Sequence, residues 1–152
     1  MKSTVLFLAI LFALVTLSAL LAHLLEMPEK LKMNNESYQI VQSIYRGWAW
    51  LGIFELGAIV LTGTWAVFRW KSRQHFPHII IAFACFVLSI LIFFLYTYPT
   101  NAATNNWTTL PDNWEQLKYK WEFSHAGRAI SNLTGLSLLV IVLVKEASPS
   151  QA

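Results

Sequence analysis

Four long apolar stretches dominate this chain of 152 residues and constrain its fold more than any other feature. They cover residues 5–25, 48–70, 79–98 and 126–144. A helix of about 20 residues, rising about 1.5 Å per residue, crosses a hydrocarbon core of about 30 Å. Because 56% of the residues are hydrophobic and only 12% are charged, a soluble domain of this size could not bury the apolar surface. We therefore expect each stretch to be a transmembrane helix.

The connections between the four stretches are short, and no linker divides the chain. This pattern predicts an all-α fold, an integral membrane four-helix bundle of up-down-up-down topology that forms a single transmembrane domain over residues 1–152. The first stretch is too long for a secretory signal and is interpreted as a retained helix. Helical apolar spacing also extends the second helix back to Ser37, and the fourth is expected to run from about Asp112 to Val144. Both would extend beyond the bilayer on the same side.

Basic residues indicate the orientation. Arg69, Lys71 and Arg73 crowd the short second connection, and Lys2 and Lys145 fall on the same side of the bundle. The excess of basic residues in short cytoplasmic loops then predicts that both termini are cytoplasmic. The formal net charge of +3 is distributed along a membrane rim, so the lipid bilayer is the expected partner and nucleic acid is not.

Two mirrored motifs stand at the margins of the first and last stretches. His23 and Glu26 are separated by two residues, and Glu122 and His125 repeat the spacing in reverse order. Residues at i and i+3 share a helix face, and the two helices run in opposite directions. Both histidines should therefore lie at one depth, with the glutamates about one turn nearer the outer surface. A third acid, Glu55, lies within the second stretch and is expected to reach the histidine layer. Ionisable groups inside a membrane are costly and usually functional.

This convergence leaves three interpretations of the outer cluster open. Two imidazoles and up to three carboxylates could hold one transition metal ion (iron, copper or zinc), with candidate ligands His23, Glu26, Glu55, Glu122 and His125. The acids are too few for a full di-iron carboxylate site. A metal-free enzyme would instead use an imidazole as base and a carboxylate to orient it, with candidate catalytic residues His125, Glu122, Arg128 and Glu55.

The third interpretation is a structural network of ion pairs. Arg128 lies one turn from His125 and could neutralise Glu55. Either Lys30 or Arg46 could serve Glu26, and Lys118 stands four residues before Glu122. Five further residues could line a pocket beside the cluster, although lipid-facing tryptophans are common: Trp48, Trp50, Trp65, Tyr96 and Asn101.

Several short segments resemble a bacterial branch of the anthrone oxygenase-like membrane proteins. They occur in the same order as in that family and span nearly the whole chain: His23–Leu31, Ile44–Trp48, Pro99–Ala103, Leu110–Trp114 and Trp121–Ala126. The resemblance implies four transmembrane helices and, from the bacterial branch, an inner-membrane location. Some members of the family are linked to oxidation of polyketide anthrones to anthraquinones with no recognised cofactor. Those members typically carry Asn-His-x-x-Arg on the fourth helix, whereas Ser124 precedes His125 here and Arg128 is retained.

Taken with the cluster, the resemblance predicts an oxidoreductase or monooxygenase whose outer-leaflet His/Glu site acts on a lipophilic aromatic or quinone-like substrate. A small non-catalytic accessory subunit of a larger membrane complex is the alternative. It would bind a stoichiometric partner, and association with a second copy of the chain is also open. A carrier is less favoured, because there is no internal repeat and no pair of broken helices.

Overall fold

A computed structural model describes residues 2–147, and all the regular elements in that range are helical. Four helical columns are long and apolar enough to cross a membrane: Thr4–Lys30, Trp48–Arg69, Phe76–Ala103 and Trp114–Glu146. The chain is therefore an all-α integral membrane protein with four transmembrane helices. The first, third and fourth columns extend beyond the corresponding predicted apolar stretches at both ends, and the second matches its stretch to within one residue.

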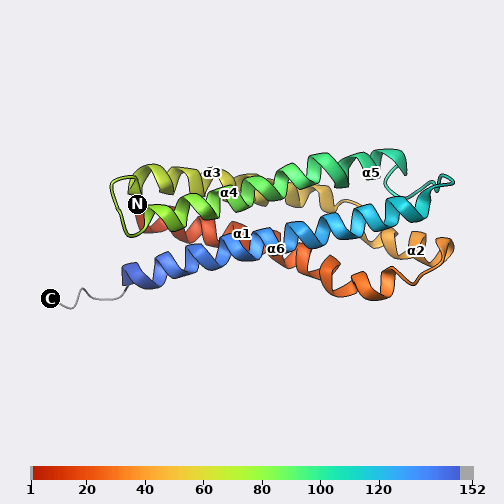
Figure 1. Cartoon of the computed structure of the whole chain (residues 1–152), viewed down its shortest axis with the longest axis horizontal. Helices are drawn as coiled ribbons and strands as arrows, with labels where there is room; N and C mark the ends of the chain where they lie inside the picture. The colour runs from red at the N-terminus through yellow and green to blue at the C-terminus, as the bar shows by residue number, and fades with distance from the viewer. Residues whose placement is uncertain (1, 148–152) are drawn as a thin grey trace.

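The columns alternate in direction and form a closed bundle (Figure 1). Helix α1 (Lys2–Lys30) contacts α3 (Gly52–Arg69) and α6 (Trp114–Ala147), and α4 (Phe76–Ile92) contacts the same two helices from the other side. The start of α1, the end of α6 and the α3–α4 connection lie at one end, here called the terminal end. The opposite end carries the short helices α2 (Asn35–Gln42) and α5 (Tyr98–Ala103) and is called the α2 end.

The apolar core of the bundle combines small side chains with large aromatic rings. Buried alanines from α1, α3 and α4 let the helices approach, and Trp65 and Phe86 fill the space between them. This core fills the half of the bundle nearer the terminal end. Near the α2 end, a separate aromatic cluster of Tyr38, Trp107 and Trp121 takes its place.

The second helix is not continuous from Ser37, in contrast to the sequence prediction. Helix α2 continues into a 3₁₀ turn, η1 (Ser43–Tyr45), and a second 3₁₀ turn, η2 (Trp48–Leu51), leads into α3. Between them Gly47 has φ 86°, a left-handed conformation that glycine adopts without the steric cost of a Cβ. The chain bends at this glycine, so α2 and α3 do not form one straight helix.

The third column also departs from a regular α-helix. Between α4 and α5 the chain forms a π-helical segment, η3 (Phe93–Thr97). Pro99 follows within two residues and lacks the N–H that would bond to the carbonyl of Leu95, which favours a wider turn at this point. Single π-turns inside α-helices often mark functional sites.

A tight connection after α5 closes the α2 end. Asn105, Asn106 and Trp107 all have positive φ, between 47° and 63°. The backbone N–H of Trp107 donates to Thr104 Oγ1 at 3.1 Å, and the Trp107 ring is buried against Tyr38. Three successive left-handed residues are rare outside glycine and need this kind of tertiary support.

Candidate functional site

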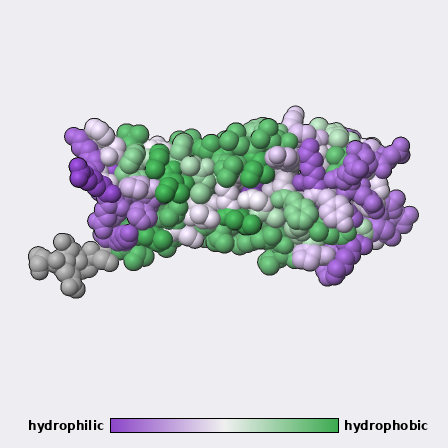
Figure 2. All heavy atoms as spheres, in the orientation of Figure 1, coloured by the Kyte–Doolittle hydropathy of each residue, from purple (hydrophilic) through white to green (hydrophobic). Residues whose placement is uncertain are grey.

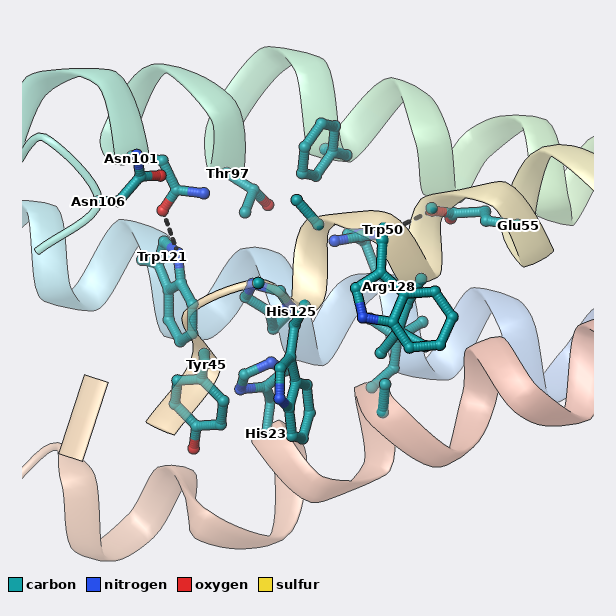
Figure 3. A pocket seen from close by; sticks show the side chains of 18 of the residues that line it. His23, Tyr45, Trp50, Glu55, Thr97, Asn101, Asn106, Trp121, His125 and Arg128 are labelled. Carbon is teal, nitrogen blue, oxygen red and sulfur yellow. Dashed lines mark hydrogen bonds and ion pairs between the residues drawn. The ribbon is translucent and has the colours of Figure 1, made fainter. Parts of the chain in front are cut away.

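A cavity of about 1000 Å³ lies inside the bundle toward the α2 end. Its walls come from α1, α3, η3 and α6, and η1, η2 and the Asn105–Thr108 segment cover it (Figure 3). The volume is at the upper limit of ordinary small-molecule pockets, about 300–1000 Å³. Trp50, Ile53 and Phe94 line the cavity and are also more than half exposed, within two candidate spans. The cavity therefore reaches the lipid-facing surface.

Aromatic rings form the wall of the cavity on the α1–α6 side. The rings of His23 and His125 are 4.2 Å apart between centroids, and Trp121 lies 4.1 Å from His125. Tyr45 and Trp48 enclose His23 at 4.3 and 5.7 Å. The prediction that both histidines share one depth is confirmed by this contact. The wall has the shape and polarity to hold a flat aromatic molecule by ring stacking.

The two imidazoles have unused hydrogen-bonding capacity. Neither nitrogen of His125 has a partner among the described residues, and His23 Nδ1 also lacks one. Both side chains are at least nine-tenths buried, with 6% and 5% exposed. A buried polar atom without a partner costs about 1–3 kcal/mol. An imidazole that lines a cavity and has no partner among the described residues is therefore suited to take a proton or a hydrogen bond from a bound molecule.

An ion pair closes the deeper end of the cavity. Arg128 Nη2 donates to Glu55 Oε2 at 2.7 Å, and Ser89 Oγ donates to Glu55 Oε1 at 2.5 Å. Asn132 Nδ2 donates to Ser89 Oγ at 2.7 Å. The guanidinium lies 4.9 Å from the centre of the Phe93 ring, and its Nε–H has no partner among the described residues. The pairing of Arg128 with Glu55, one of the sequence alternatives, is confirmed.

The other two acids lie outside the cavity wall. Glu122 Oε1 is 2.9 Å from Lys30 Nζ and accepts a hydrogen bond from Tyr38 OH at 2.9 Å, with all three residues buried. Glu26 lies 4.0 Å from the same Lys30 Nζ and accepts a hydrogen bond from the Tyr45 hydroxyl. These contacts form a polar cluster at the α2 end, above the histidines.

This polar cluster keeps its two tyrosines protonated. Burial raises the pKa of Tyr38, and the neighbouring Glu122 carboxylate raises it further. Burial and the hydrogen bond to Glu26 raise the pKa of Tyr45 in the same way. Both phenols lie outside the membrane-spanning segments and act as hydrogen-bond donors to carboxylates.

The structure does not bring together the five residues considered as metal ligands. His23 and His125 face the cavity, Glu55 is held by Arg128 and Ser89, and Glu26 and Glu122 are held in the α2-end cluster. Over residues 2–147, no three His, Cys, Asp or Glu side chains are grouped as a metal site. The donor arrangement therefore does not fit the single-metal site considered from the sequence, because each carboxylate already has a cationic or hydroxyl partner.

Three of the five residues expected to line a pocket do line the cavity: Trp48, Trp50 and Asn101. Tyr96 does not line it, and Trp65 is packed in the apolar core instead. Asn101 Oδ1 accepts a hydrogen bond from Trp121 Nε1 at 2.8 Å, which fixes the indole against His125 (Figure 3). The sequence analysis did not single out Ser89 or Asn132. The available signal for these two residues was a polar side chain inside an apolar stretch.

Fold and site together define a class: a four-helix integral membrane protein with a buried aromatic cavity that carries an imidazole pair and an arginine–glutamate pair. The sequence pattern of the family described as anthrone oxygenase matches residues 41–138, more than half of the chain, and the chain belongs to this family. The matched range contains Glu55, His125 and Arg128, whereas His23 and Glu26 precede it. Searches of curated proteins and of solved structures gave no significant match.

Proposed function

We propose that this protein is a membrane oxygenase that oxidises a lipophilic aromatic ketone or related quinone precursor. The observation that carries the proposal is the buried His125 imidazole, which has no hydrogen-bond partner among the described residues and lines a cavity that reaches the lipid surface. The family's description, anthrone oxygenase, names a substrate and an oxidant of matching chemistry. An anthrone is flat and apolar, and it carries an acidic methylene between two aromatic rings.

The proposed reaction converts a methylene to a carbonyl, and dioxygen supplies the oxygen. Imidazole of His125 removes one methylene proton, and the negative charge moves onto the ketone oxygen as an enolate. Dioxygen oxidises this anion and adds to its carbon, and His125 returns the proton to form a hydroperoxide. Loss of the second methylene hydrogen with cleavage of the O–O bond leaves the new carbonyl and releases water. One methylene and one dioxygen thus give one carbonyl and one water.

Arg128 is the group best suited to stabilise the enolate. Its side chain lines the same cavity as His125 and lies one helical turn away on α6, and its buried Nε–H has no partner among the described residues. A donor aimed at a developing oxyanion in a water-poor site commonly contributes about 100- to 1000-fold in rate. Trp121, Tyr45 and His23 would hold the aromatic rings.

Replacing His125 tests the proposal. For purified protein supplied with anthrone, we expect anthraquinone formation and dioxygen uptake well above the protein-free rate. His125→Ala should lower the protein-dependent rate by about 100-fold or more, since positioned general bases contribute about 100- to 10,000-fold. His78→Ala, which alters a histidine at the terminal end, should retain the wild-type rate. A folded His125→Ala protein with undiminished turnover would overturn this assignment.

The buried Lys30–Glu122–Tyr38 contacts favour one other candidate, a non-catalytic accessory subunit. They fix α1, α2 and α6 together without lining the cavity, as expected of a scaffold for a membrane complex. This candidate requires a stoichiometric partner, or a second copy of the chain, after mild solubilisation. Purified protein that runs as a monomer and turns over anthrone would exclude it.

We further propose a bacterial inner-membrane location with the terminal end in the cytoplasm. Arg69, Lys71 and Arg73 cluster in and beside the α3–α4 connection at that end. The cavity would then open toward the outer leaflet, from which a lipophilic substrate could enter between α3 and η3.

A further inference from the structure

The proposed chemistry assigns Arg128 to the stabilisation of an anion, yet the Glu55 carboxylate lies directly beside it. Both side chains line the cavity, and they are 7% and 2% exposed. A lone buried arginine would be a general anion site. Here Glu55 Oε2 lies 2.7 Å from Arg128 Nη2 and cancels its charge before any ligand binds.

Glu55 is held in place from three helices. Arg128 on α6 and Ser89 on α4 each donate to one oxygen of the Glu55 carboxylate on α3. Asn132, one turn beyond Arg128, donates to Ser89 Oγ and also to the Arg128 carbonyl at 3.1 Å. Glu55, Ser89 and Asn132 are all at most 2% exposed. The carboxylate therefore cannot turn away to admit another anion without breaking several buried hydrogen bonds.

The guanidinium keeps donors that Glu55 does not use in this arrangement. Arg128 Nε–H is buried and has no partner among the described residues, and the Phe93 ring covers the guanidinium at 4.9 Å. The site thus offers a hydrogen bond and no net charge. A neutral ketone oxygen satisfies the donor, whereas a carboxylate or phosphate would add a second negative charge beside Glu55 at low dielectric.

We infer that Glu55, positioned by Ser89 and Asn132, makes the cavity selective for ligands that present a neutral carbonyl oxygen and excludes permanently anionic ones. The inference rests on the proposed function for the choice of an aromatic ketone, and it concerns binding and not turnover. Negative charge is then accommodated at Arg128 only as it develops on the bound ketone. Specificity by a built-in repulsive group is a common device in binding sites.

Equilibrium binding of two probes tests this inference. Anthraquinone is neutral and anthraquinone-2-carboxylate is anionic, and both should quench the fluorescence of Trp48 and Trp121 in the cavity wall. In one detergent at fixed pH, the wild-type protein should bind the quinone at least about tenfold more tightly than the carboxylate. Glu55→Gln should reduce this ratio about tenfold or reverse it, because Arg128 is left with an uncompensated charge.

Two further variants separate charge from structure. Glu55→Gln combined with Arg128→Gln removes both charges and should lose the gained affinity for the carboxylate. Glu26→Gln removes an acid outside the cavity wall and should leave the wild-type ratio unchanged. Circular dichroism and gel filtration establish folding. If Glu55→Gln does not fold, the wild-type ratio and the double variant still decide.

The inference is overturned if the wild-type protein binds the carboxylate as tightly as the quinone, or binds neither. It is also overturned if Glu55→Gln changes the ratio no more than Glu26→Gln does. Neutral selectivity without any oxidation of anthrone would contradict the proposed function and support this inference. The proposed function and this inference would therefore be contradicted by different measurements.

Discussion

Lys30 and Glu122 show how a residue near the membrane surface can be structural although its motif looks catalytic. Lys30 is 1% exposed and holds Glu122 at 2.9 Å, while the rings of Tyr45 and Trp121 lie within 5 Å of its ammonium group. A buried ion pair contributes little more to stability than two apolar side chains of similar size would. Removing one partner, however, leaves the other as an unpaired buried charge and is strongly destabilising. Glu122 does not line the cavity, so we assign it to the stability of the α2 end.

Replacing Glu122 should therefore affect stability strongly. We expect Glu122→Gln to lower the free energy of unfolding by about 3–5 kcal/mol, because Lys30 loses its buried counter-charge. Titration with sodium dodecyl sulfate in mixed micelles measures this change. Glu29→Gln is the matched control, since Glu29 pairs with Lys32 at 2.7 Å but both side chains are largely exposed. That change should be below about 1 kcal/mol. Equal, small effects of the two substitutions would contradict the assignment.

The mirrored spacing of the two motifs predicted the histidine pair, and it could not predict which acids face the cavity. Helical periodicity fixes the depth and face of His23 and His125, and these are enough to bring them together. The partner of Glu122 depended on tertiary geometry: Lys118, four residues earlier, instead donates to the carbonyls of Leu31 and Met33 just beyond α1. Lys30 from another helix takes its place, and no local spacing encodes that choice.

At the scale of elements, the break between η1 and η2 decides the shape of the cavity. The bend at Gly47 separates η1 from η2, and Tyr45 and Trp48 on either side of it lie around His23. Apolar spacing alone predicted one long second helix, because it reports which face is apolar and not where the backbone turns. A glycine between Arg46 and Trp48 was the available signal for the turn.

Alanine at Gly47 should strain this turn. A Cβ there meets nothing within 4 Å, so the expected loss of about 1–2 kcal/mol comes from the positive φ alone. Gly52 also has open space around its Cβ position but sits in a right-handed conformation at φ −56°. Gly52→Ala should be neutral or stabilising. Thermal unfolding of both variants measures the contrast, and similar shifts in Tm would argue against a required left-handed residue.

At the scale of the whole molecule, apolar residues cover most of the middle of the bundle on the face that Figure 2 shows, and hydrophilic residues collect at both ends. Composition and stretch length were sufficient to predict this arrangement, since only a bilayer can cover so much apolar surface. The shape of the cavity could not be predicted from the sequence. It depends on the π-helical η3, on the left-handed segment after α5 and on the bend at Gly47. At each of these places the backbone departs from a regular α-helix.

The proposed orientation predicts which end of the bundle water-soluble reagents reach from outside the cell. With Cys85→Ala as background, Thr109→Cys lies in the connection before α6 and Ser72→Cys in the α3–α4 connection. A membrane-impermeant maleimide should label the first in intact cells and the second only after permeabilisation. The opposite pattern would invert the topology and place the terminal end outside.

Isotopic labelling of the product tests the central claim most directly. Purified wild-type protein should convert anthrone to anthraquinone under ¹⁸O₂ with one labelled oxygen atom per quinone and one dioxygen consumed, because dioxygen supplies the new carbonyl oxygen. The rate should exceed that of His125→Ala by about 100-fold or more, with the variant near the protein-free reaction. Unlabelled quinone, or equal rates for the two proteins, would contradict an oxygenase that uses this cavity.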